Sequence, residues 1–135
     1  MKILMREDNR KRITRFQEVL AEWPACGLKV WRDAHSMIQA LDHELNGTTL
    51  VCLDHDLIPD PGDPDPGDGL MVAEAIASLT PVCDIAIHST NVHRVQSMIR
   101  ELNDGGWNTH RIAPSGMGED WITSIWLLKI KRILR

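Results

Sequence analysis

Short apolar runs alternate along this chain with segments in which apolar residues recur every three or four positions. The runs predict β-strands, and the recurring spacing predicts amphipathic helices because it places apolar side chains on one helix face. The predicted strands cover residues 2–5, 28–31, 50–53, 82–87 and 109–113. The predicted helices cover residues 10–23, 33–45, 70–79, 92–102 and 119–134.

A strand followed by a helix therefore occurs five times in succession. Alternation of this kind requires crossover helices, and it predicts a parallel sheet with helices packed on both faces. The third run, residues 50–53, is apolar throughout, which is typical of a strand buried on both faces. Because no long linker interrupts the pattern, we expect residues 1–135 to form one α/β domain.

The composition is that of an ordinary globular protein, with 43% hydrophobic and 25% charged residues. A net charge of -4 provides no general attraction for nucleic acid or for an acidic membrane surface. No apolar run approaches the roughly 18 residues that span a bilayer, and the apolar N-terminal stretch is too short for a signal peptide. We therefore expect a cytoplasmic protein without a membrane partner.

Polar side chains directly follow three of the predicted strands. Glu7 and Asp8 follow the first strand, Asp54 and Asp56 follow the third, and the sequence His-Ser-Thr-Asn at 88–91 follows the fourth. In the flavodoxin-like strand order 2-1-3-4-5, ligands bind beyond the carboxyl ends of the first and third strands. Carboxylates gathered there repel one another, and a divalent cation such as Mg²⁺, which takes oxygen ligands, would relieve the repulsion. We predict that Glu7, Asp8, Asp54 and Asp56 are metal ligands.

Other roles for these side chains stay open at this point. Asp8 precedes a predicted helix and could instead act as a helix cap, since acidic residues are common at helix starts. Asp54 is costly to bury at the end of an apolar strand without a partner, which favours a functional role. If strand geometry continues, Asp54 and Asp56 point to one side and His55 points to the other.

The same residues resemble the receiver domains of two-component signalling over nearly the whole chain. The matching segments are MKILMREDN, LVCLDHDL, the GDG before the third helix and the hydroxyl residue after the fourth strand. The resemblance implies a receiver-like, flavodoxin-like fold, a metal-binding pair at Glu7 and Asp8, a phosphoacceptor at Asp54 and a phosphate contact at Ser89. Receivers have a lysine before a proline after strand five, where this chain has Ala113, and this difference argues against ordinary phosphorelay.

The chain resembles still more closely the cyclic-phosphate-processing receiver domains. That pattern is matched by the acidic pair, LDHDL at 53–57, Asp-Gly at 68–69, HSTN at 88–91 and Arg12 in the first helix. The two histidines make the match specific, because receivers need no histidine at either place. The resemblance implies a cyclic nucleotide or a cyclic-phosphate RNA end as the partner, with Arg12 among the substrate-binding residues.

The residues themselves are compatible with this chemistry. Opening a cyclic phosphodiester requires proton transfer and positive charge near the phosphoryl oxygens. Histidine exchanges protons near neutrality, so we predict His55 and His88, with Asp54, as catalytic residues. A divalent cation on the carboxylates would supply charge and a bound nucleophile. Ser89 and Asn91 are predicted to hold phosphate oxygens.

Turnover itself stays an open question in the sequence. A phosphoesterase-like enzyme acting on cyclic phosphates is one hypothesis, and a divergent receiver acting as a phosphorylation or ligand-binding switch without turnover is the main alternative. A domain that only binds other proteins is a third hypothesis. The missing strand-five lysine weighs against conventional phosphorelay, and the added histidines favour the first hypothesis over the third.

The last predicted helix has more apolar residues than one helix face can hold. They are Trp121, Ile122, Ile125, Trp126, Leu128, Ile130, Ile133 and Leu134. Deep packing of a terminal helix would account for this excess. Alternatively, part of the surface meets a partner or a second copy of the chain, as in a homodimer.

Overall fold

The computed structural model describes residues 1–54, 67–116 and 118–135 of the chain. Its strands are β1 (Lys2–Arg6), β2 (Gly27–Trp31), β3 (Leu50–Leu53), β4 (Asp84–Ile87) and β5 (Thr109–Arg111). They form one sheet in the order β2-β1-β3-β4-β5, and every neighbouring pair is parallel. This order confirms the predicted flavodoxin-like, receiver-like fold.

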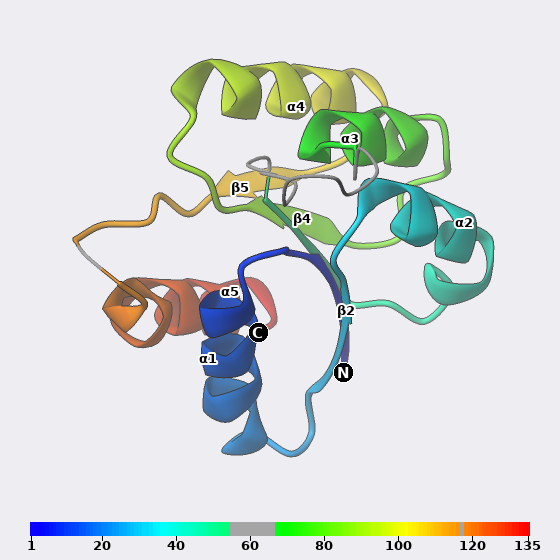
Figure 1. Cartoon of the computed structure of the whole chain (residues 1–135). Coiled ribbons are helices and arrows are strands. Elements are labelled where there is room, and N and C mark those ends of the chain that lie inside the picture. Colours follow the sequence, from blue (N-terminus) through cyan, green and yellow to red (C-terminus); the bar gives the residue numbers. More distant parts are fainter. Residues whose placement is uncertain (55–66, 117) are drawn as a thin grey trace.

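Helices cover both faces of this sheet (Figure 1). They are α1 (Arg10–Ala21), α2 (Ala34–Glu44), α3 (Gly69–Ala77), α4 (Val92–Asp104), the π-helical segment η1 (Ile122–Trp126) and α5 (Leu127–Ile133). One face packs against α1, η1 and α5, and the other packs against α2, α3 and α4. None of the helices in the described ranges is long and apolar enough to cross a bilayer.

The side chains of β1 alternate between the two resulting cores. Ile3 and Met5 pack in the core beside α1 and α5, whereas Leu4 packs in the core beside α2, α3 and α4. Alternation therefore turns Arg6, the last residue of β1, toward the same side as Leu4. In the register of the sheet Arg6 pairs with Leu53, so the residues that follow these two, Glu7 and Asp54, leave the sheet side by side.

The C-terminal segment differs from the single helix predicted over 119–134, because it begins with the π-helical segment η1. The wider π-helical turn changes which side chains face the sheet. Its buried apolar residues are Trp121, Ile122, Trp126 and Ile130. Packing against the sheet thus accounts for much of the apolar excess, while Leu128 is 55% exposed. Contact with a partner through this helix stays a prediction.

The close approach of α3 and α4 requires a glycine at position 105. A Cβ atom there would lie 2.5 Å from the carbonyl oxygen of Ala77 and 3.0 Å from its Cα. Because both obstacles are backbone atoms, we expect Gly105→Ala to lower the free energy of unfolding by roughly 1–3 kcal/mol in urea denaturation. Gly27→Ala is the control, since a Cβ there meets only the Met1 carbonyl oxygen at 3.8 Å. Equal stability of the two variants would contradict the prediction.

Candidate functional site

Glu7 is the first residue after β1 and its side chain is fully buried. Its Oε2 accepts hydrogen bonds from the backbone N–H groups of Asp8 at 3.0 Å and Asn9 at 3.2 Å. These two bonds fix the turn between β1 and α1. They also hold the carboxylate at the carboxyl edge of the sheet, with Oε1 directed to other partners.

His88 follows β4 and lies opposite Glu7. Its Nε2 is 3.1 Å from Glu7 Oε1, and both side chains are 0% exposed. The imidazole ring packs against Phe16 and Trp121, with ring centroids 5.3 Å and 5.9 Å away. Because a carboxylate accepts hydrogen bonds, the Nε2 atom carries the proton and, in the neutral ring, Nδ1 keeps its lone pair. Nδ1 is buried and has no hydrogen-bond partner among the described residues.

Asp54 follows β3, is 1% exposed, and is held by an arginine that sequence analysis did not single out. Its carbonyl oxygen accepts hydrogen bonds from Arg6 Nε at 3.1 Å and Arg6 Nη2 at 2.8 Å. Arg6 Nη2 also lies 3.7 Å from Asp54 Oδ2. The sequence did contain a signal for this residue: an arginine ends an otherwise apolar strand, directly before the acidic pair.

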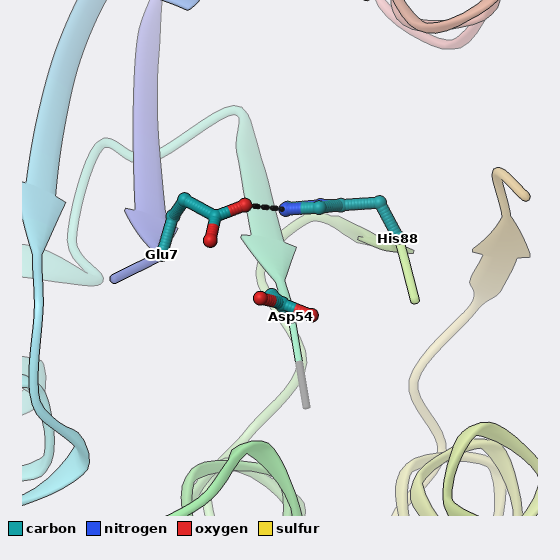
Figure 2. Close-up of side chains that lie close together, drawn as sticks. All are labelled: Glu7, Asp54 and His88. Carbon is teal, nitrogen blue, oxygen red and sulfur yellow. Dashed lines mark hydrogen bonds and ion pairs between the residues drawn. The ribbon is translucent and has the colours of Figure 1, made fainter. Parts of the chain in front are cut away.

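Glu7, Asp54 and His88 bring their polar atoms together at the ends of three neighbouring strands. One ligand atom from each residue lies within 4.8 Å of the other two. Figure 2 shows Glu7 and His88 pointing toward one another, with Asp54 beside them. Arg12 approaches from α1, with Nη1 3.8 Å from Glu7 Oε1 and its guanidinium 5.5 Å from the centre of the Trp121 ring.

The surroundings change the acidity of two groups in this cluster. Burial alone raises the pKa of Glu7, but the hydrogen bond and charge of His88, with contributions from Asp54 and the Asn9 N–H, lower it to about 2. Burial lowers the pKa of Arg6, against the opposing effect of nearby carboxylates. An arginine remains charged under such conditions because its ordinary pKa is so high. The cluster thus contains an ionised Glu7 and a cationic Arg6 near neutrality.

The lowered pKa of Glu7 links folding to pH. The carboxyl has an ordinary pKa of 4.5 and a folded-state pKa of about 2, so the folded protein binds this proton less readily. Its contribution to stability is complete above about pH 4.5 and is lost as the pH falls through about 2. Between about pH 5 and pH 2 we expect wild type to lose on the order of 3 kcal/mol more than Glu7→Gln. Urea denaturation across this range measures the difference, and parallel curves would contradict it.

Three further predicted residues lie around this cluster. Asp8 is half-buried, and its carbonyl oxygen accepts a hydrogen bond from Arg32 at 3.4 Å. The N-cap of α1 is Asn9, so the alternative role of Asp8 as a helix cap is not realised. Ser89 is buried, and its Oγ accepts from the Asn91 N–H at 3.1 Å. The Asn91 side chain caps α4, which gives it a structural task besides the predicted phosphate contact.

The structure leaves some predicted features outside the described residues. These are His55, Asp56 and the Pro-, Asp- and Gly-rich loop 59–68 apart from Gly67 and Asp68. Asp68 caps α3, with its Oδ1 accepting from the Met71 N–H at 2.9 Å. The roles assigned to His55 and Asp56 stay predictions.

The predicted acidic cluster is present, but its described donors do not fit Mg²⁺. Magnesium prefers near-octahedral oxygen ligands. The converging group offers an imidazole nitrogen and two carboxylates, one from Glu7 and one from Asp54. Glu7 Oε1 already contacts His88 and Arg12, and Asp54 Oδ2 already lies beside Arg6. A magnesium ion would therefore compete with cations that belong to the protein.

The family comparison bears directly on this site. The family model described as "Cyclic-phosphate processing Receiver domain" matches residues 1–104, a range that contains the whole Glu7, Asp54 and His88 cluster. The chain belongs to this family. Membership confirms the resemblance drawn from the acidic pair and the two histidine motifs. A search of curated protein sequences finds no match to this cyclic-phosphate processing receiver domain.

Solved receiver domains share the fold of this cyclic-phosphate processing receiver domain. The signal receiver domain of an HD domain-containing protein from Pseudomonas fluorescens Pf-5 aligns with a TM-score of 0.68 and 19% identity, covering 98% of this chain and 93% of that chain. A CheY-like receiver domain protein from Methanospirillum hungatei JF-1 aligns with a TM-score of 0.69 and 18% identity, covering 98% and 92%. The response regulator domain of Thermotoga maritima CheB gives 0.68 and 10% identity, covering 99% and 96%. At these identities the similarity shows the fold alone.

Proposed function

We propose that this domain binds a cyclic phosphate ester, either a cyclic nucleotide or a cyclic-phosphate RNA end, and opens it by hydrolysis. The observation that carries the proposal is the buried pair of Glu7 and His88 beside Asp54. A carboxylate that fixes one ring nitrogen of a histidine orients the other nitrogen as a base, which is an arrangement used in general-base catalysis. The family description supports the substrate class.

His88 is the proposed group for proton transfer. In the proposed step, Nδ1 accepts a proton from water while the water oxygen attacks phosphorus. One ring P–O bond breaks, and the imidazolium returns the proton to the leaving alkoxide. The balance is one water added to one cyclic diester, which yields a phosphomonoester and a free hydroxyl. Glu7 keeps the ring oriented and stabilises its charged form.

Positive charge for the phosphoryl oxygens is available from Arg6 and Arg12, each within 4 Å of a site carboxylate. Such charge stabilises the extra negative charge that develops in the transition state. Ser89 and Asn91 are predicted to hold phosphate oxygens. A divalent cation, predicted from the sequence as Mg²⁺, is the alternative source of charge, so the presence of metal is a variable in the test.

Access to the site requires a rearrangement, because Glu7, Asp54 and His88 are each at most 1% exposed. Arg12 has a side chain that is 24% exposed and stacks on Trp121. It therefore reaches solvent, unlike the three buried groups. We expect Arg12 to contact an incoming phosphate before the buried groups do.

The test is a hydrolysis panel of 2′,3′-cyclic nucleotides, 3′,5′-cyclic nucleotides and RNA with a cyclic-phosphate end. Each substrate is incubated with EDTA, Mg²⁺ or Mn²⁺, and phosphomonoester formation is followed by ³¹P NMR or chromatography. Turnover that depends on His88 supports the proposal. Absence of product from every substrate under every metal condition refutes the proposed activity.

A second candidate is a receiver-like switch in which Asp54 is phosphorylated without turnover of a cyclic phosphate. The receiver fold and the place of Asp54 at the carboxyl end of β3 favour it. In this reaction a carboxylate oxygen of Asp54 attacks acetyl phosphate, acetate leaves, and an acyl phosphate forms. Intact mass measurement should then show a phosphoryl addition in wild type and none in Asp54→Asn. An unchanged wild-type mass argues against this candidate.

A further inference from the structure

Both buried carboxylates of the site already lie within 4 Å of a guanidinium group. Arg6 Nη2 is 3.7 Å from Asp54 Oδ2, and Arg12 Nη1 is 3.8 Å from Glu7 Oε1. Each of these two carboxyl groups therefore has a cation of the protein beside it. A divalent cation is attracted to this group much less than to the same carboxyl groups without the arginines, and the guanidinium groups repel it.

Arg6 is the cation that is fixed in place. Its side chain is 0% exposed, and both Nε and Nη2 donate to the carbonyl oxygen of Asp54, at 3.1 Å and 2.8 Å. The carboxylates of Asp54, Glu7, Asp8 and Asp68 all favour its charged form. Such a guanidinium cannot leave the site without breaking two buried hydrogen bonds, so a metal ion cannot simply displace it.

We propose that Arg6 is the resident cation of the acidic site and that it binds the phosphoryl group there in place of a divalent metal. Arg6 Nη1 is buried and has no hydrogen-bond partner in the described part of the chain, although buried N–H groups normally have one. A phosphoryl oxygen is a suitable acceptor for that nitrogen. The inference that no metal is resident rests on the positions of the two guanidinium groups, whereas the phosphate contact rests on the proposed function.

The test measures Mg²⁺ and Mn²⁺ binding directly, by calorimetry for both ions and by electron paramagnetic resonance for Mn²⁺. We expect no saturable binding to wild type at low millimolar metal, and no change of its melting temperature with EDTA. Arg6→Met removes the fixed charge and should bind Mg²⁺ at least about tenfold more tightly. Arg6→Lys keeps the charge and should stay as weak as wild type. Arg100→Met, a change on the exposed side of α4, controls for net charge.

Saturable sub-millimolar Mg²⁺ binding by wild type would overturn the proposal, and so would equal Mg²⁺ affinity in wild type and Arg6→Met. The wild-type measurement needs no variant, so the proposal remains testable if Arg6→Met does not fold. These measurements do not require turnover. A domain without hydrolase activity that also binds no Mg²⁺ would refute the proposed function and leave the resident-cation inference standing.

A separate measurement tests the proposed contact between Arg6 and a phosphate. In EDTA, inorganic phosphate should raise the melting temperature of wild type and of Arg100→Met. In Arg6→Met the shift should be lost, and Arg6→Lys should recover part of it, because lysine restores the charge without the two-pronged geometry. An equal phosphate-dependent shift of the melting temperature in wild type and Arg6→Met would overturn the proposed phosphate contact.

Discussion

Replacing His88 with alanine should lower the rate of cyclic-phosphate hydrolysis by roughly 10²- to 10⁴-fold, the range typical for loss of a general base or acid. The variant loses Nδ1, the proposed proton acceptor, and leaves Glu7 without the ring that it orients. The expected loss is in kcat, because the imidazole is proposed to act on water and on the leaving oxygen. Initial rates under saturating substrate measure it.

Because the His88 ring contacts Phe16 and Trp121, His88→Ala removes packing contacts as well as the proposed proton acceptor. A second variant has to separate these two effects. His88→Gln fills much of the same space and can still donate to Glu7, yet it cannot accept the proton. It should be as inactive as His88→Ala while staying folded. His110→Ala is the matched control: His110 pairs with Asp84 at 2.9 Å, at the start of β4 and away from the site. Near-wild-type rates in both His88 variants would contradict the role.

Replacing Arg6 with methionine should lower the free energy of unfolding by about 3–5 kcal/mol, the usual cost of removing one member of a buried ion pair. Methionine retains much of the length and apolar volume of arginine, so a cavity contributes little. The loss comes from removing the charge beside the Asp54 carboxylate and both side-chain donors to its carbonyl oxygen. Urea denaturation at neutral pH measures the change, and added Mg²⁺ should recover part of it.

An exposed ion pair provides the contrast. Lys29 Nζ lies 2.8 Å from Glu44 Oε1, but the Lys29 side chain is 56% exposed. Solvent screens such pairs, so Lys29→Met should cost at most about 1 kcal/mol. Arg6→Lys should fall between the two changes, because it keeps the charge and loses the two-pronged hydrogen bonding. If Arg6→Met proved as stable as Lys29→Met, the buried guanidinium would not be the main support of Asp54.

Much of the fold could be predicted from sequence because its signals are local. Apolar runs and three-and-four spacing located every strand and helix that the structure describes, and their alternation indicated a parallel sheet. The ends of the strands were predicted less accurately, because pairing with a neighbouring strand, and not composition, sets where a strand begins and ends. The fourth strand was predicted from residue 82, but it begins at Asp84, where its partner β3 begins with Leu50.

The sequence also placed the acidic residues at the right edge of the sheet. Glu7, Asp54 and His88 each directly follow a strand, and parallel strands all end at the same edge, so their convergence follows from strand order. Strand order does not show which contacts each side chain makes at that edge. Asn91, predicted for phosphate, is engaged as the cap of α4.

Tertiary structure alone decided how the charges of the site are balanced. Arg6 appeared in the sequence as the first polar residue after a strand, yet it ends β1 and turns inward to Asp54. Trp121, directly before the π-helical segment, packs against His88, which the spacing of apolar residues did not predict. Both outcomes depend on contacts between residues 33 to 48 positions apart. Periodicity describes only neighbours along the chain, so it determined where the acidic residues lie and could not determine which cation meets them.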